Sequence, residues 1–150
     1  MPNLQMKLVN YKTLNARQQE TYNFQKVSGV LADFGFTTIR LSDDWQGADF
    51  IANHIGGQQF LKVQLKGRLT LDQKYQDKDI WICFRYRDIW YLYRHDEALT
   101  WALKNKTLGK NPEIWKNGNG SWSYPVPPKD FLRWLAPYAL TNHSFEPAQL

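Results

Sequence analysis

Residues 47–67 have the sequence GADFIANHIGGQQFLKVQLKG, in which apolar and polar residues alternate on both sides of a glycine pair. Two strand-like runs, Ala48–Ile55 and Gln58–Gly67, separated by Gly56-Gly57, are typical of a β-hairpin with a two-residue turn. The pairs expected in that register are Asn53 with Phe60, Ile51 with Lys62 and Asp49 with Gln64, alternating with Ala52 opposite Leu61 and Phe50 opposite Val63. One face of the hairpin is therefore apolar, and the other carries the polar residues.

Three functional groups converge on the polar face of this hairpin. Asp49 is expected opposite Gln64, and Lys66 shares their face because side chains two residues apart on a strand point the same way. Opposite residues of an antiparallel pair have their Cβ atoms about 4.5–5.5 Å apart. A slip of one residue would move Asp49 away from Gln64, so the convergence depends on the turn.

The segment before the hairpin has the periodicity of a helix. We expect the helix over Asn15–Phe34, with Asn15 as its N-cap, Gln18 in the third helical position and Gly35 as the stop. Its apolar stripe is formed by residues three or four positions apart, namely Phe24, Val27, Leu31 and Phe34. Because Glu20 lies four residues before the first of these, its carboxylate is expected on the core-facing stripe rather than on the solvent face.

The remaining chain predicts further strands, two short helices and three irregular segments. Strands are expected at Thr37–Leu41, Ile80–Tyr86 and Ile89–Arg94, the last two joined by a turn at Arg87-Asp88. Helices are expected at His95–Lys104 and Pro128–Leu135. Irregular segments are expected at Ser42–Gly47, Arg68–Asp79 (with a short helical turn) and Asn105–Pro128. This order predicts an α/β fold, as an α+β or three-layer arrangement on a mixed sheet.

Length and composition limit the class of protein. The chain has 150 residues, of which 43% are hydrophobic and 22% charged, so we expect one globular domain over residues 1–150 and exclude a disordered or fibrous protein. The net charge of +5 favours a polyanionic partner. The single cysteine, Cys83, lies in an apolar run and predicts a buried structural thiol. With no apolar run of membrane-spanning length and no signal-peptide pattern, we expect a cytoplasmic protein.

The polar residues of the hairpin suit the hydrolysis of a phosphodiester. This reaction needs a cation to polarise the phosphoryl group, an activated water and a positive group near the charge that develops. Asp49 is a suitable ligand for Mg²⁺, and Glu20 adds a second oxygen ligand if the helix crosses the end of the hairpin. Lys66 is placed to orient the water or to stabilise the transition state. The three histidines, His54, His95 and His143, show no metal-ligand spacing, and capping or surface roles are expected for them.

The runs Gly47–Ala52 and Phe60–Lys66, preceded by a helix that holds Glu20, resemble the core of the PD-(D/E)XK nuclease superfamily. Within it, the likeness is to the branches that include archaeal Holliday-junction resolvases and certain group I intron homing endonucleases, and it covers about residues 14–70. The resemblance implies a restriction-endonuclease-like αβββαβ core and DNA cleavage that depends on Mg²⁺ or Mn²⁺. It also implies that Asp49 is the metal-binding aspartate, Lys66 the catalytic lysine and Glu20 the helix glutamate of some branches.

The sequence departs from the superfamily pattern at Gln64, where most members have Glu or Asp. Gln64 offers a neutral carbonyl oxygen in the metal set of Asp49, Glu20 and Gln64, so it weakens the metal site unless Glu20 or a substrate phosphate compensates. Some similar nucleases have Gln here, which is consistent with an active enzyme; the alternative is an inactive nuclease-fold module that binds DNA or scaffolds a DNA-processing complex. Simpler interpretations also stand: Gln64 and Lys66 as the solvated face of a sheet, Asp49 as a turn residue, and Glu20 as a helix-rim residue or the partner of Lys66.

A basic and aromatic surface is the expected contact with DNA. The lysines and arginine assigned to it are Lys62, Arg68, Lys74, Lys106, Lys110 and Lys116, with Trp115 and Trp122 as candidates for base stacking. The alternative for the tryptophans is a place in the core or in oligomer contacts, and an interaction protein without a nucleic-acid role is the third hypothesis. We expect a homodimer or higher symmetric oligomer because palindromic or branched DNA needs two active centres, with Asn105–Pro128 as its interface.

Overall fold

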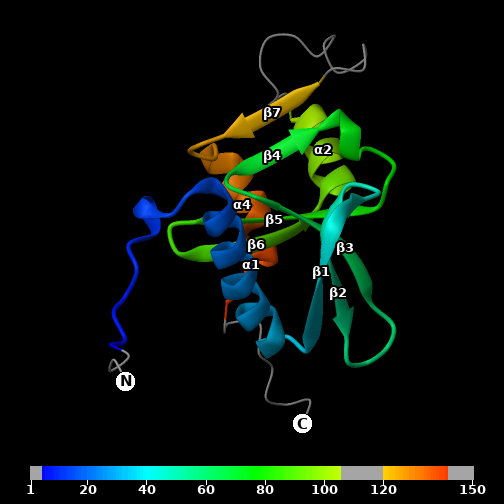
Figure 1. Ribbon diagram of the computed structural model, residues 1–150. Helices are drawn as coiled ribbons and strands as arrows, with labels where there is room; N and C mark the ends of the chain where they lie inside the picture. Colours follow the sequence, from blue (N-terminus) through cyan, green and yellow to red (C-terminus); the bar gives the residue numbers. More distant parts are fainter. Residues whose placement is uncertain (1–4, 106–119, 142–150) are drawn as a thin grey trace.

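The computed structural model describes residues 5–105 and 120–141 (Figure 1). Its α-helices are α1 (Ala16–Asp33), α2 (His95–Lys104) and α4 (Lys129–Leu135). Its strands are β1 (Phe36–Trp45), β2 (Ala48–His54), β3 (Phe60–Lys66), β4 (Leu69–Asp72), β5 (Ile80–Tyr86), β6 (Ile89–Arg94) and β7 (Ser121–Tyr124). Short 3₁₀ turns are η1 (Tyr11–Thr13), η2 (Gln73–Tyr75) and η3 (Ala136–Tyr138). The helices at His95–Lys104 and Pro128–Leu135 are therefore confirmed, the second to within one residue.

The main sheet is mixed, which confirms the predicted α/β class. Its strand order is β1-β2-β3-β5-β6, with β3 and β5 parallel and the other neighbours antiparallel. The connection from β3 to β5 contains β4 and η2, where the αβββαβ order has a helix. The chain thus follows that order through α1, β1, β2 and β3, and departs from it at the crossover. The next helix, α2, comes after β6.

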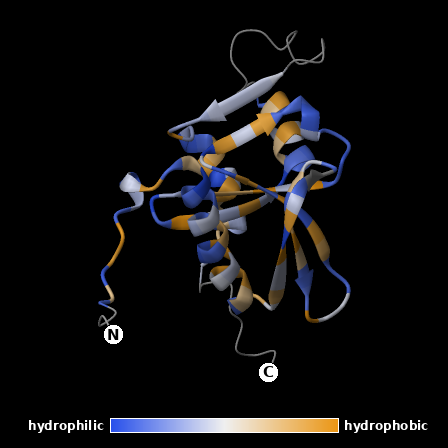
Figure 2. Ribbon diagram, in the orientation of Figure 1, coloured by the Kyte–Doolittle hydropathy of each residue, from blue (hydrophilic) through white to orange (hydrophobic). Residues whose placement is uncertain are grey.

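Apolar residues of the sheet are buried on both of its faces. On one face, Val27 and Leu31 of α1 pack against Phe50, Val63 and Cys83. On the other face, β4, α2 and α4 cover β5 and β6, and the core there is formed by residues that include Leu71, Ile82, Tyr93, Leu99 and Phe131. Figure 1 shows α1 apart from α2, with β4 and β7 beyond one end of the main sheet. Along β1–β3, hydrophobic and hydrophilic residues alternate, as a sheet with two different faces requires (Figure 2).

The β2–β3 register agrees with the prediction. Asn53 pairs with Phe60, and the paired positions continue through Ala52–Leu61 and Ile51–Lys62 to Phe50–Val63. The turn is longer than the predicted two residues, because the last backbone contact is from His54 N–H to the Gln59 carbonyl at 3.0 Å. The four-residue loop preserves the same register, and so it leaves Asp49 and Gln64 on the predicted face.

Helix α1 begins where the capping signal predicts. The Asn15 side chain accepts from Gln18 N–H, and the Gln18 side chain accepts from Asn15 N–H, both at 2.9 Å. Gly35 follows the helix with a φ of +85°, a conformation that favours glycine. The reciprocal cap fixes the N-terminal end of α1. The N-terminal half of this helix faces the end of the hairpin.

All three predicted irregular segments contain strand residues. Ser42–Gly47 was expected as a loop, but β1 continues to Trp45 and turns at Gln46-Gly47, whose φ angles of 51° and 88° match a tight hairpin turn. Arg68–Asp79 holds β4 as well as the expected helical turn. β4 pairs with β7, which lies within the third segment, Asn105–Pro128. The predicted dimer contacts at residues 106–119 of that segment lie outside the described residues. The Arg87-Asp88 turn between β5 and β6 is confirmed.

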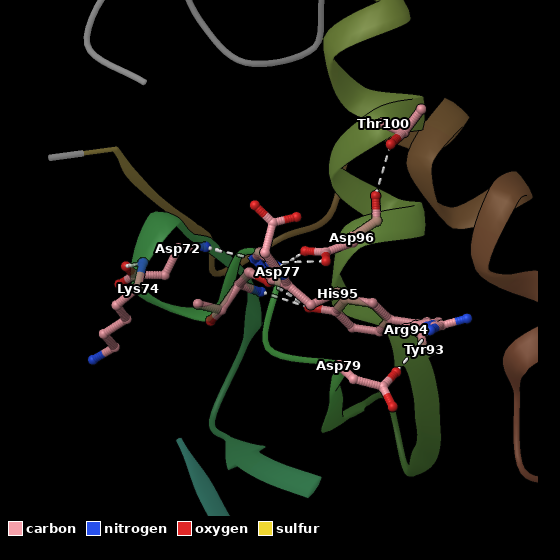
Figure 3. Close-up of polar contacts among 10 residues, drawn as sticks. Asp72, Lys74, Asp77, Asp79, Tyr93, Arg94, His95, Asp96 and Thr100 are labelled. Carbon is pink, nitrogen blue, oxygen red and sulfur yellow. Dashed lines mark hydrogen bonds and ion pairs between the residues drawn. The ribbon is translucent and has the colours of Figure 1, made fainter. Parts of the chain in front are cut away.

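Two buried residues complete the account of the core. Cys83 is buried as predicted, and desolvation raises the pKa of its thiol. His95 was expected at a cap or on the surface, but its side chain is fully buried and links β4 to α2 (Figure 3). Its Nε2 accepts from the backbone N–H of Asp72, and its Nδ1 lies 3.0 Å from Asp96 Oδ1. His143 lies outside the described residues. Over the described ranges, no helix is long and apolar enough to cross a membrane.

Candidate active site

A cavity of about 530 Å³ lies between α1 and the end of the β2–β3 hairpin. Its helix side is formed by the first half of α1 with the preceding turn η1, and its sheet side by β1, the start of β2 and the end of β3. All four residues that the sequence singled out for catalysis line this one cavity, namely Glu20, Asp49, Gln64 and Lys66. Residues 46 positions apart in the chain thus share one polar cavity, as the shared face and the preceding helix predicted.

The carboxylate of Asp49 is held by the backbone of the neighbouring strand. Asp49 is the second residue of β2, and its Oδ2 accepts from Leu65 N–H on β3 at 2.8 Å. The last paired positions of the two strands at this end of the hairpin are Phe50 and Val63. Just beyond them, this bond fixes the position of one carboxylate oxygen. Charge-assisted bonds of this kind are stronger than those between neutral groups. The Asp49 side chain is therefore oriented before any ligand binds.

Gln64 presents a buried acceptor that the protein leaves unused. Its Oε1 is inaccessible to solvent and, among the described residues, has no hydrogen-bond partner. An unsatisfied buried acceptor costs about 1–3 kcal/mol, so such groups are rare without a reason. In a cavity lined by Asp49 and Lys66, a cation, a bound water or a donor on a ligand can supply the missing partner.

Lys66 lies beside an aromatic ring that it shares with a second lysine. Its Nζ is 5.3 Å from the centre of the Tyr75 ring, and the Nζ of Lys74 is 5.1 Å from the same centre. Tyr75 is buried in η2, on the crossover from β3 to β5, so its ring is a rigid platform. Lys74, predicted to contact DNA, therefore shares the Tyr75 ring with Lys66.

Glu20 lines the cavity but is not on the core-facing side of α1. Its side chain is exposed, whereas Val27 and Leu31 of the same helix are fully buried. The expectation of a core-facing carboxylate is therefore wrong. The reason is that the N-terminal half of α1 lines the cavity instead of packing on the apolar core, so the stripe faces a polar space at that end. Glu20 thus sits at the rim, opposite the sheet.

The donor set of the cavity fits a hard divalent cation that keeps part of its water shell. Among the described residues, no three His, Cys, Asp or Glu side chains are close enough together to hold a metal ion. Mg²⁺ commonly binds through one or two carboxylates together with waters, and it prefers oxygen ligands. Asp49 supplies a fixed carboxylate and Gln64 an unpartnered carbonyl oxygen. The residues present fit such an ion, with Glu20 available from the rim.

The other predicted DNA-binding residues are spread over the surface. Arg68 is exposed just after β3. Lys62 lines a separate hollow with Lys78, and its Nζ is 3.4 Å from Gln46 Oε1. Lys106, Lys110, Lys116 and Trp115 lie outside the described residues. Trp122 packs against the core, which agrees with the alternative that the tryptophans are core residues.

Sequence reasoning missed three residues on the helix side and the β1 wall of the cavity, namely Tyr11, Asn23 and Arg40. Asn23 lies one helical turn after Glu20, and this i, i+3 spacing was an available signal. Arg40 is held against α1, since its Nη1 donates to Thr21 Oγ1 at 2.8 Å. Tyr11 precedes the helix, and no pattern in the sequence indicates that η1 returns to the cavity.

Comparisons with known proteins give a structural likeness but no match to a family model or a curated protein. Among solved structures, the fold is similar to that of Hjc from Archaeoglobus fulgidus, a Holliday junction resolvase from an archaeal hyperthermophile, with 18% sequence identity and a TM-score of 0.42. The match covers 51% of this chain and 72% of the resolvase. A TM-score of this size marks a partial overlap, so the likeness by itself assigns neither a site nor an activity to this chain.

Proposed function

We propose that this protein is a PD-(D/E)XK-type nuclease that hydrolyses DNA phosphodiester bonds with Mg²⁺ or Mn²⁺. The observation that carries the proposal is the grouping of Asp49, Gln64, Lys66 and Glu20 along one cavity, together with the unpartnered buried Oε1 of Gln64. Carboxylates, a carbonyl oxygen and a lysine are the groups that metal-assisted phosphodiester hydrolysis requires.

Each residue has a defined role in this proposal. A bound divalent ion supplies Lewis-acid polarisation of the phosphoryl group and lowers the pKa of a coordinated water. Asp49, oriented by Leu65 N–H, and Gln64 Oε1 would hold that ion, and Glu20, which lines the same cavity, would be a further ligand. Lys66 orients the attacking water or stabilises the negative charge that develops on the phosphorus centre.

The surrounding cations are assigned to the DNA backbone. Lys74 and Lys66 both contact the Tyr75 ring, and Arg68 is exposed immediately after the strand that carries Lys66. Such contacts contribute salt-dependent affinity without sequence preference. We assign Lys62 and the lysines at 106, 110 and 116 to the same role. The proposal includes a single domain, a symmetric oligomer and a cytoplasmic location.

A second candidate function is supported by the neutral side chain at position 64. Glutamine leaves the cavity with one negative charge fewer than a carboxylate would, and no group of three ionisable ligands gathers within the described ranges. An inactive nuclease fold that binds DNA or scaffolds a DNA-processing complex would show both features. Metal-dependent cleavage separates the two functions.

The test is nicking of supercoiled plasmid and of a four-way DNA junction by purified protein in Mg²⁺, Mn²⁺ or EDTA. Wild type is expected to cleave with either metal and not in EDTA, whereas Asp49→Ala and Lys66→Ala lose cleavage. Asp33→Ala, which removes an exposed carboxylate at the far end of α1, serves as the matched control and retains it. Absence of cleavage, or cleavage that survives both site substitutions, would overturn the proposal in favour of the DNA-binding module.

A further inference from the structure

The helix wall of the cavity contains a hydrogen-bonded pair that the proposed chemistry does not use. Tyr11 of η1 and Asn23 of α1 both line the cavity, and Asn23 Nδ2 donates to the Tyr11 hydroxyl at 2.9 Å. The Oδ1 of Asn23 is buried and, among the described residues, has no partner. Asn23 Oδ1, like Gln64 Oε1, is thus an acceptor that a bound water can satisfy, while the amide nitrogen of Asn23 is committed to Tyr11.

Tyr11 is anchored although it precedes the first helix. Its carbonyl accepts from Gln19 Nε2 at 3.2 Å, and its ring centre lies 5.2 Å from that of Tyr22. The guanidinium carbon of Arg85, on β5, is 5.7 Å from the centre of the same ring. Contacts from α1 and from the sheet therefore fix both the backbone and the ring of Tyr11.

The bond from Asn23 determines what the Tyr11 hydroxyl offers. A tyrosine hydroxyl has one proton to donate and also accepts hydrogen bonds. Here it accepts from Asn23, and among the described residues no acceptor takes its proton. A neutral donor is thus held on the helix side of the cavity, whereas Asp49 and Gln64 lie on its sheet side.

We propose that Tyr11 is a substrate-binding residue whose hydroxyl donates to a non-bridging phosphate oxygen of the DNA strand in the cavity. Asn23 is a positioning residue, because it acts by orienting that hydroxyl. This inference rests on the proposed function for the identity of the ligand. Phosphate oxygens only accept hydrogen bonds, so they match the free proton of Tyr11, and the cavity is wide enough for a sugar-phosphate segment at about 530 Å³.

The test is DNA affinity, measured by fluorescence anisotropy with a labelled four-way junction and a labelled duplex in EDTA, where cleavage does not interfere. Tyr11→Phe keeps the ring and removes the hydroxyl, and it is expected to weaken binding roughly tenfold, as the loss of a hydrogen bond to a charged group does. Tyr22→Phe is the matched control, since the Tyr22 ring packs against that of Tyr11 in a tilted arrangement but does not line the cavity, and it keeps wild-type affinity. Thermal unfolding checks that all variants are folded.

Two further readouts separate a phosphate contact from a packing effect. Because a hydroxyl is neutral, Tyr11→Phe leaves the dependence of affinity on salt unchanged, whereas Lys74→Ala reduces that slope by about one. Asn23→Leu weakens binding in the wild-type background and adds nothing to Tyr11→Phe, because it acts through the same hydroxyl.

Equal affinity of Tyr11→Phe and wild type, or equal weakening by Tyr11→Phe and Tyr22→Phe, would overturn the inference. If wild type binds DNA without cleaving it and Tyr11→Phe binds more weakly, the inference stands and the proposed catalysis fails. If wild type binds neither the four-way junction nor the duplex, the inference and the proposed function are both overturned.

Discussion

At the scale of single residues, Gln64 sets the charge of the cavity. Its neutral carbonyl oxygen is buried without a partner beside Asp49 and Lys66. We expect Gln64→Glu to add a charged oxygen ligand and to lower the Mg²⁺ concentration for half-maximal plasmid cleavage several-fold. Gln64→Leu, of similar size but without an oxygen, should raise that concentration or abolish cleavage. A midpoint that is the same in wild type and both variants would remove Gln64 from the metal set.

His95 gives a second prediction at this scale, for stability against pH. Burial lowers the pKa of His95, and the hydrogen bond to Asp96 together with the carboxylate charges of Asp96 and Asp72 only partly opposes that shift. The unfolded chain therefore binds a proton at this histidine near pH 6.5, whereas the folded protein does not. The contribution of His95 to the free energy of unfolding is fully present above that pH. It falls as the pH drops below 6.5, by at most about 1.4 kcal/mol per pH unit.

The measurement is urea unfolding at pH 7.5 and 5.5. Wild type is expected to lose stability between these values, and His95→Gln, which keeps an acceptor for Asp72 N–H, is expected to lose less. An equal loss in both proteins would mean that other groups carry the pH dependence.

At the scale of elements, α1 has to hold two cavity residues without help from a deep apolar contact at its N-terminal end. The reciprocal cap between Asn15 and Gln18 stabilises that end. Asn15→Ala is expected to cost about 1 kcal/mol of the free energy of unfolding, which lowers the melting temperature by roughly 2–4 °C. Differential scanning calorimetry measures this, with Asn105→Ala at the C-cap of α2 as a comparison. An unchanged melting temperature would show that the cap is not needed.

The elements also show which parts of the fold a sequence predicts. The β2–β3 register and the start of α1 were predicted because alternation, a short turn and a capping box are local signals. β4 was missed because it has four residues and pairs with β7, about fifty residues later, which no local pattern indicates. The spacing along α1 predicted that Glu20 lies on the same side of the helix as its apolar stripe. It did not predict that Glu20 is exposed, because that depends on how far the sheet extends under the helix.

The candidate site was predictable to the same extent. Asp49, Gln64 and Lys66 follow from the hairpin, and their common cavity agrees with that pattern. Asn23 was missed although its i, i+3 spacing from Glu20 was an available signal, and Tyr11 was missed because a tyrosine before a helix has no distinctive spacing. Their roles depend on tertiary contacts, and in particular on the bond that joins them.

At the scale of the whole molecule, the proposed activity predicts a symmetric assembly. Cutting both strands of a palindromic or branched DNA requires two active centres, and closed two-fold symmetry is the usual way to supply them. Light scattering coupled to gel filtration at micromolar concentration is expected to give twice the 17.7 kDa of the chain or a higher even multiple. The mass of a single chain would contradict this prediction.

The central claim is that the cavity between α1 and the β2–β3 hairpin holds a divalent metal ion through Asp49. Mn²⁺ binding to the DNA-free protein, followed by electron paramagnetic resonance titration, tests it without relying on cleavage. Wild type and Asp33→Asn, whose exposed carboxylate lies away from the cavity, are expected to bind Mn²⁺ equally, and Asp49→Asn is expected to lose that site. Absence of bound Mn²⁺ in wild type, or binding that Asp49→Asn leaves unchanged, would contradict the account.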